Sequence, residues 1–310
     1  MTITGQIVDI LNERIFPGEI NIKDGKIQSI VECSDAPSRY ILPGFVDSHI
    51  HIESTLLLPE NFAPLSLAQG TIGVVADPHE IANVLGEDGV DFMIESGRKV
   101  PFYFYFCAPS CVPCSPFENA GAVLNSSDIE RLMEREDVFA LAELMNAFGT
   151  INGDAEILAK IAAAQKYGKP VDGHAPGFRG DAAKKYIEAG VSTDHECTTI
   201  EEAEERIAMG MKILIREGSA ACDFEALFPL LNSHKDNVML CTDDKYADDL
   251  LEGSINQIVS RAMNKGLPLW NVLRAACITP VFHYHLRHGI LRIQDTADFI
   301  IVDSLKDFNV

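Results

Sequence analysis

The chain has few basic residues and no long apolar run. Its 310 residues include 25 Lys and Arg against 46 Asp and Glu, which gives a formal net charge of −21. Such a surface repels phosphate backbones and anionic lipid, so no nucleic acid and no membrane partner is expected. No apolar stretch approaches the length of a membrane span, and residues 1–5 lack a basic segment followed by an apolar one. The sequence therefore predicts a cytoplasmic protein that binds small molecules or metal ions.

Cysteine is also too sparse for a disulfide scaffold. The 8 cysteines in 310 residues lack the density of such a scaffold, and we predict reduced thiols. Cys107, Cys111 and Cys114 follow a C-x₃-C-x₂-C pattern that invites a zinc or iron–sulfur interpretation. A fourth cysteine is missing nearby, and the pattern follows a predicted strand, so we expect loop thiols without a ligand role.

A repeating pattern occupies most of the chain. A short apolar run with a polar or glycine-containing end is followed by a stretch with helical spacing, of which 152–167 and 199–209 are the clearest. Eight such runs occur, at 45–53, 71–80, 101–110, 138–146, 170–176, 191–198, 211–219 and 237–244. Strands that alternate with helices pair in parallel, and eight repeats are typical of a (β/α)₈ barrel of the TIM type. A doubly wound sheet is the alternative, but polar residues at nearly every strand end favour a barrel, whose strand ends face one mouth.

The two ends of the chain have a different pattern. Residues 1–42 alternate in polarity, with a hairpin turn signal at 23–26, and residues 289–310 again indicate β structure. We therefore expect one small β satellite built from both termini. The predicted domains are 1–42 and 289–310 for the satellite and 43–288 for the barrel.

The pair His49 and His51 lies in an apolar run that is predicted to be a buried strand. Residues i and i+2 of a strand face the same way, so both imidazoles converge, which indicates a divalent metal. Two hydrogen-bonded core histidines are the alternative. Polar side chains end the other runs as well: Asp77, His79, Glu80, Glu143, His174, His195, Glu196, Arg216, Glu217, Asp243 and Asp244.

Four imidazoles and two carboxylates are more ligands than one tetrahedral ion needs. They suit a pair of divalent metal ions that share a bridging carboxylate and hydroxide. The mixed nitrogen and oxygen donors allow manganese, iron or zinc. Because two ions lower the pKa of a bound water to about 7, hydrolysis is the expected chemistry.

The segment 42–51, Leu-Pro-Gly-Phe-Val-Asp-Ser-His-Ile-His, resembles the opening motif of the amidohydrolase superfamily, which are metal-dependent hydrolases on this barrel with a β satellite. Further motifs resemble its adenine deaminase family, in the same order along the chain. They are 51–54, 76–84, 110–113, 142–146, 172–177, 194–197, 215–220 and 241–244.

The resemblance implies a role for each matching residue. His49 and His51 would bind the first metal, His174 and His195 the second, and Glu143 would bridge them. Asp243, with Asp244 as the alternative, would contact a metal and shuttle protons.

The implied reaction is hydrolytic deamination of adenine to hypoxanthine and ammonia, a step of purine salvage, by a metal-activated hydroxide that attacks C6. Glu80 or His79 would protonate the ring. Glu80, Arg216, Glu217 and Ser219 would contact the purine, although Arg216 and Glu217 are equally consistent with a buried ion pair that holds their strand.

The chain departs from this family in two respects. Adenine deaminases of this kind continue well beyond the position of Val310, so the chain would be a fragment or a short member, and Cys222 replaces an arginine. Two alternatives follow: an amidohydrolase that acts on another cyclic amide, amidine or N-acyl compound, or a truncated metal-binding protein without turnover. We also expect a homo-oligomer.

Overall fold

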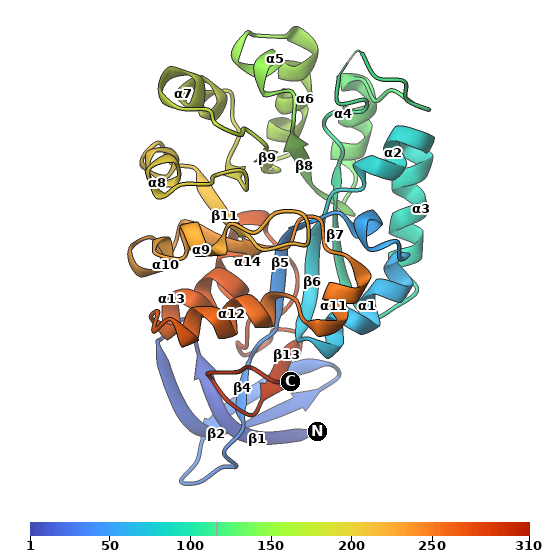
Figure 1. The fold of residues 1–310 in the computed structure, drawn as a ribbon. Helices are drawn as coiled ribbons and strands as arrows, with labels where there is room; N and C mark the ends of the chain where they lie inside the picture. Colours follow the sequence, from blue (N-terminus) through green and yellow to red (C-terminus); the bar gives the residue numbers. More distant parts are fainter. Residues whose placement is uncertain (116) are drawn as a thin grey trace.

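Eight parallel strands form the centre of the molecule in the computed structural model, which describes residues 1–115 and 117–310 (Figure 1). They are β5 (Phe45–Ile50), β6 (Thr71–Ala76), β7 (Tyr103–Ala108), β8 (Val138–Leu144), β9 (Val171–Gly173), β10 (Thr193–Asp194), β11 (Lys212–Arg216) and β12 (Val238–Cys241). Each strand lies inside one of the eight predicted runs. The apolar runs therefore located every strand of this part of the fold.

The strands close into a barrel through two seams. Ladders join β5 to β9 in one arc and β10 to β12 in another, in sequence order. At one seam the backbone N–H of Asp243 donates to the carbonyl of His49 at 2.9 Å, and at the other Ser192 donates to Val171 at 2.8 Å. Gly173 permits the second seam, because a Cβ there would lie 2.2 Å from the carbonyl oxygen of Thr193. The predicted barrel is confirmed, and the doubly wound alternative is wrong.

Helices follow the strands and cover the outside of the barrel. They are α1 (Pro59–Ala68), α2 (His79–Leu85), α3 (Glu87–Gly97), α4 (Ser126–Glu134), α5 (Ala147–Ile151), α6 (Ala155–Lys166), α7 (Gly180–Glu188), α8 (Ile200–Ala208), α9 (Phe224–Leu227), α10 (Leu230–Ser233), α11 (Ala247–Glu252), α12 (Ile255–Asn264), α13 (Leu269–Leu273) and α14 (Thr279–Tyr284), with a 3₁₀ turn η1 (Ile52–Thr55) and a π-helical turn η2 (Arg274–Ile278). The two clearest predicted helices are α6 and α8. Each begins at a side-chain cap: Asp154 accepts the N–H groups of Glu156 and Ile157, and Thr199 accepts that of Glu202. Within the described residues, no helix is long and apolar enough to cross a membrane.

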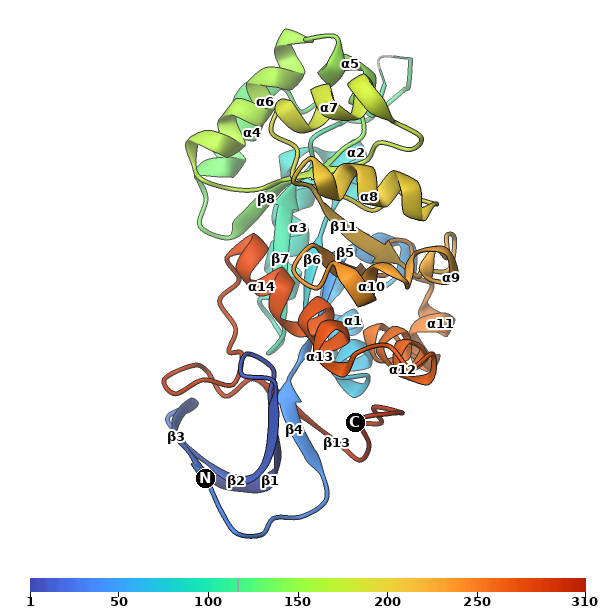
Figure 2. The same cartoon turned by 90° about the vertical axis from the view of Figure 1, so that its left-hand side faces the viewer.

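A five-stranded sheet lies at one end of the barrel, where both chain termini are found (Figure 2). It consists of β1 (Thr2–Asp9), β2 (Arg14–Lys23), β3 (Lys26–Glu32), β4 (Tyr40–Pro43) and β13 (Phe299–Val302), in the order β13-β4-β1-β2-β3. Asp24 and Gly25 form the predicted hairpin turn with φ of 52° and 71°, and β13 pairs antiparallel with β4. A satellite from both termini is therefore confirmed, whereas the exact domain limits stay predictions. The expected strand at 289–291 is wrong, since those residues form a loop.

Candidate metal centre

His49 and His51 end β5 and point to the same place, as the two-residue period of a strand requires. Their exposed fractions are 2% and 3%, and their Nε2 atoms are 3.2 Å apart. The Nδ1 atom of His51 lies 3.1 Å from the backbone carbonyl of Asp77, which can accept only from a protonated nitrogen. The lone pair of Nε2 is therefore free to face the interior of the cluster.

Carboxylates from opposite sides of the barrel meet these two histidines. Asp243 Oδ1 lies 3.5 Å from Nε2 of His49 and 3.1 Å from Nε2 of His51. Glu143 Oε1 lies 3.2 Å from Nε2 of His51. Asp243 also has a φ of 57°, so a turn in the left-handed region directs its side chain inward directly after β12.

Glu143 also reaches the histidines of β9 and β10. Its Oε2 atom lies 2.6 Å from Nδ1 of His174 and 3.3 Å from Nε2 of His195. The ring of His195 stacks on that of His49, with centroids 4.2 Å apart. All six residues predicted as metal ligands therefore meet, and Glu143 lies between the two halves of the set.

The donor atoms fit divalent cations. Among the described residues, His49, His195 and Asp243 form one group with ligand atoms within 4.8 Å of one another, and Glu143, His174 and His195 form another. Burial raises the pKa of Asp243, but the neighbouring imidazoles of His49 and His51 outweigh it and hold this pKa well below the usual range. The pKa of Glu143 is likewise held low against burial by its histidines. Both acids therefore remain carboxylates, which are the form that binds a metal.

The residues that follow β6 extend the cluster. Asp77 Oδ2 lies 3.0 Å from Nδ1 of His79, and the same nitrogen lies 3.5 Å from Oε1 of Glu143. Burial lowers the pKa of His79, but the Asp77 carboxylate raises it to about 9 overall. Glu80 contacts both neighbouring histidines, with Oε1 3.6 Å from Nε2 of His79 and Oε2 3.7 Å from Nδ1 of His51. Both predicted candidates for the ring acid therefore lie at the centre, together with Asp77.

Arg216 at the end of β11 lies behind Asp243. Its Nη1 atom is 3.0 Å from Oδ2 of Asp243 and also pairs with Glu196, while its Nε donates to Asp223 at 3.0 Å. Glu196 Oε1 is 3.4 Å from Nε2 of His195. The sequence predicts no role for Glu196, although its place directly after His195 at a strand end brings it to the centre.

Two residues predicted to contact the substrate lie elsewhere. Glu217 pairs with Arg261, and Ser219 donates to Asp249. Both line a separate cavity of about 300 Å³. Arg216 and Glu217 do not pair with each other, but both form ion pairs: Arg216 with Glu196, Asp223 and Asp243, and Glu217 with Arg261.

Asp244 also points away from the cluster, since its side chain accepts the hydroxyl of Ser54. Asp243 is therefore the strand-eight aspartate that faces the histidines. The cysteines of the described residues are all free. Cys107 is buried inside β7, so the expected loop position is wrong for it, whereas Cys111 follows the strand and its Sγ accepts the backbone N–H of Asn146 at 3.3 Å.

A buried ion pair supports the second half of the set. Arg206 of α8 pairs with Asp194, and both side chains are almost completely buried. Asp194 also accepts the backbone N–H of Ala175 at 2.9 Å and that of Glu196 at 2.9 Å. These two amides directly follow His174 and His195, so the pair fixes the segments that present both imidazoles.

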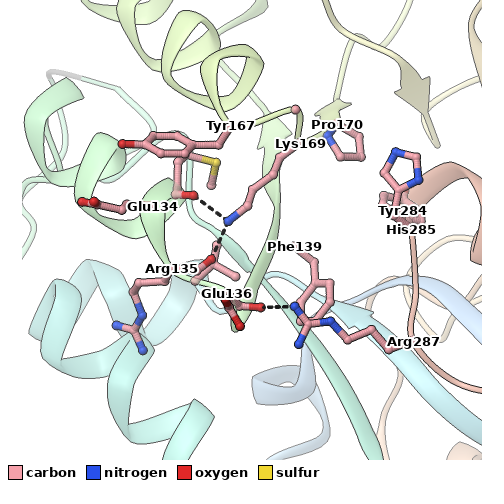
Figure 3. Close-up of a pocket in the computed structure, with 13 residues that line it drawn as sticks. Glu134, Arg135, Glu136, Phe139, Tyr167, Lys169, Pro170, Tyr284, His285 and Arg287 are labelled. Carbon is pink, nitrogen blue, oxygen red and sulfur yellow. Dashed lines mark hydrogen bonds between the residues drawn. The ribbon is translucent and has the colours of Figure 1, made fainter.

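A cavity of about 320 Å³ opens at the other face of the barrel (Figure 3). It lies at the start of β8 and β9 and beside the segment that follows α14. Its cations are already engaged: Lys169 donates to the carbonyls of Met133 and Arg135 at 2.6 Å, and Arg287 donates to that of Glu136 at 3.1 Å. Because it is at the amino ends of the strands, it is separate from the cluster.

The fold and the cluster define a (β/α)₈-barrel protein with a candidate metal centre at the carboxyl ends of its strands. The chain belongs to the amidohydrolase family, whose family model matches residues 40–310.

Adenine deaminases are similar to this chain over almost its whole length. The protein from Methanosarcina mazei is 52% identical over 99% of this chain and 55% of its own length. For the proteins from Salinibacter ruber and Borreliella burgdorferi the identities are 51% and 50%, over 100% and 99% of this chain and 57% of each relative. The chain thus spans about half the length of the curated relatives it matches, and the resemblance noted from its motifs is confirmed.

Solved structures confirm the fold. A β-aspartyl dipeptidase from Fervidobacterium islandicum aligns with a TM-score of 0.72 and 18% identity, over 100% of this chain and 94% of that one. An N-acetyl-D-glucosamine-6-phosphate deacetylase from Mycobacterium smegmatis aligns with a TM-score of 0.70 and 16% identity, over 99% and 96%. At these identities the likeness concerns the fold alone.

Proposed function

We propose that this centre hydrolyses adenine to hypoxanthine and ammonia with the help of two divalent metal ions. One observation carries the proposal: Glu143 directs one oxygen to His51 and the other to His174 and His195. A carboxylate in this position can serve two ions at once. The similarity to adenine deaminases supports adenine as the substrate.

The chain supplies ligands for both ions. His49, His51 and Asp243 would hold one ion, and His174 and His195 the other, with Glu143 shared. The donors are imidazole and carboxylate, which suit manganese or iron and also accept zinc. When bound, the ions would lower the pKa of a water to about 7 and so supply a nucleophile at neutral pH.

The protein's own groups handle the protons. Asp243 accepts the proton that the attacking water gives up, and Arg216 orients this carboxylate through Oδ2. Glu80 is placed to protonate a ring nitrogen, because its side chain is 38% exposed beside His51 and His79, and burial raises the pKa of its carboxyl, which favours the protonated form. His79 is already engaged by Asp77, which favours Glu80 as the acid. Asp243 then passes its proton to the exocyclic amine, which leaves as ammonia. The C6 hydroxyl gives up its proton as it becomes the carbonyl of hypoxanthine, and this proton restores the carboxyl of Glu80.

The direct test is to incubate the purified chain, loaded with Mn²⁺, with adenine and to measure ammonia and hypoxanthine. Equal amounts of both products are expected, and chelator-treated protein is the control. If the chain releases ammonia from a different ring, or hydrolyses an N-acyl compound, and does not turn over adenine, that compound would be the substrate instead of adenine. Metal-loaded protein that turns over none of these compounds would contradict the proposal and favour a metal-binding chain without turnover.

A further inference from the structure

A buried lysine interrupts the apolar stripe of α6. The buried face of this helix includes Ile157, Ile161 and Ala164, and Lys160 on the same face is only 5% exposed. Lysine is almost never buried to this extent unless it is paired. Among residues 1–115 and 117–310, no carboxylate forms an ion pair with Lys160, and burial lowers the pKa of its ammonium. The ammonium therefore needs other strong acceptors.

Two backbone carbonyls take the place of a counter-ion. The Nζ atom of Lys160 donates to the carbonyl of Ser110 at 2.8 Å and to that of Leu124 at 2.7 Å. Ser110 follows β7, and Leu124 precedes α4. One ammonium therefore holds both ends of the segment that connects β7 with α4.

The start of this segment is attached to the end of β8, which carries Glu143. The ladder between β7 and β8 has its last pair at Ala108 and Leu141, so it stops two residues before Glu143. Beyond that point the hydroxyl of Ser110, which is 1% exposed, donates to the backbone carbonyl of Glu143 at 2.5 Å. A side-chain hydrogen bond therefore continues the connection where the ladder ends.

We propose that Lys160 is a positioning residue of the metal centre: it fixes Ser110, whose hydroxyl in turn fixes the backbone of Glu143. Glu143 directs one oxygen to His51 and the other to His174, so a shift of its backbone would change the geometry of both halves of the ligand set. The inference rests on the proposed function only in that Glu143 is the shared metal ligand, and it does not depend on adenine as the substrate.

The test is the affinity of Lys160→Met for Mn²⁺, measured by equilibrium dialysis on the folded chain without adenine. Methionine retains the apolar stem but donates no hydrogen bond, so the carbonyls of Ser110 and Leu124 lose their donor. Lys160 acts on Glu143 through another residue, and we therefore expect the Mn²⁺ affinity to fall about 10-fold, the lower limit for loss of an outer-shell partner.

Lys169→Met is the matched control. Lys169 also donates to two backbone carbonyls, both at 2.6 Å, but it lies at the amino ends of the strands (Figure 3). Both variants lose two lysine–carbonyl hydrogen bonds, so both should melt at a lower temperature than the wild type. Only Lys160→Met should bind Mn²⁺ more weakly. Equal Mn²⁺ affinities of the two variants would overturn the proposal, because Lys160 would then stabilise the fold alone.

A double-variant cycle tests the route through Ser110. Ser110→Ala should itself weaken Mn²⁺ binding about 10-fold. Because both substitutions break the same connection, the double variant with Lys160→Met should lose much less than the product of the two effects, which is about 100-fold. The full product would overturn the proposal, since the two residues would then act independently. If Lys160→Met does not fold, Lys160→Gln, whose shorter amide cannot hold both carbonyls, provides the same comparisons.

Adenine turnover is measured separately from Mn²⁺ binding. A wild-type chain that binds Mn²⁺ but leaves adenine unchanged would contradict the proposed function, while the comparison of affinities would still decide the role of Lys160. An active wild type whose two lysine variants bind Mn²⁺ equally well would overturn only the role of Lys160.

Discussion

The buried pair of Arg206 and Asp194 should make a large contribution to stability. The Arg206 guanidinium also donates to Glu202 and to the carbonyls of Ala175 and Phe178. Arg206→Met retains most of the apolar stem but leaves the Asp194 carboxylate buried without its cation. Removing one partner of a buried pair costs about 3–5 kcal/mol, so the free energy of unfolding should fall by about that amount.

Urea unfolding monitored by circular dichroism measures this change, and Arg179→Met is the matched control. Arg179 pairs with Glu205 on the surface, where its side chain is 49% exposed. A surface pair contributes about 0–1 kcal/mol, so the control should remain close to the wild type. The double variant Arg206→Met with Asp194→Asn should recover part of the loss, because the unpaired charge is removed as well.

The same substitution should weaken metal binding in the second half of the centre. Asp194 holds the amides that follow His174 and His195, and it loses its anchor when Arg206 is replaced. We expect Mn²⁺ affinity to fall about 10–100-fold, as it does when an outer-shell partner is removed. The reasoning is refuted if Arg206→Met unfolds at the same urea concentration as Arg179→Met.

Three further predictions concern the chemistry, the barrel seam and pH. Asp243→Asn should abolish adenine turnover and retain most of the metal, whereas Asp244→Asn should remain active; steady-state assays with metal analysis would expose the reverse. Gly173→Ala should lower the melting temperature, because its Cβ would lie 2.2 Å from a carbonyl oxygen of β10; unchanged melting would show that the seam can relax. Burial lowers the pKa of His288 from 6.5 to about 4, so its contribution is fully present above pH 6.5 and is lost as the pH falls towards 4. Between pH 7.5 and 5 this loss in the free energy of unfolding is about 2 kcal/mol. His288→Gln should remove it, so the free energy of unfolding derived from melting curves should depend less on pH by that amount, whereas the control His234→Gln should leave the pH dependence unchanged.

Short-range patterns predicted most of the barrel. The apolar runs placed the eight strands, and Asp154 and Thr199 marked the starts of two helices, because capping involves only neighbouring residues. The loop at 289–291 shows where such patterns fail. Leu291 is buried in the core of the satellite at a φ of 67°, so its apolar character serves packing without a strand.

The sequence by itself determined which residues end the strands, and therefore which side chains reach the mouth of the barrel. The period of two in a strand also determined that His49 and His51 face together. Only the tertiary structure decided which of the strand-end residues meet. Arg216 lies at the centre while Glu217 pairs with Arg261, and Asp77 lies beside His79 and Glu143.

The physical reason is the range of these contacts. The histidines of β5 meet Asp243 only after the barrel closes between β12 and β5, and the two strands are joined there by backbone hydrogen bonds between residues far apart in the chain. Local propensity carries no information about such a distance. The sequence could therefore predict a candidate metal centre and name six candidate ligands, but the contact of Arg216 with Asp243 became visible only in three dimensions.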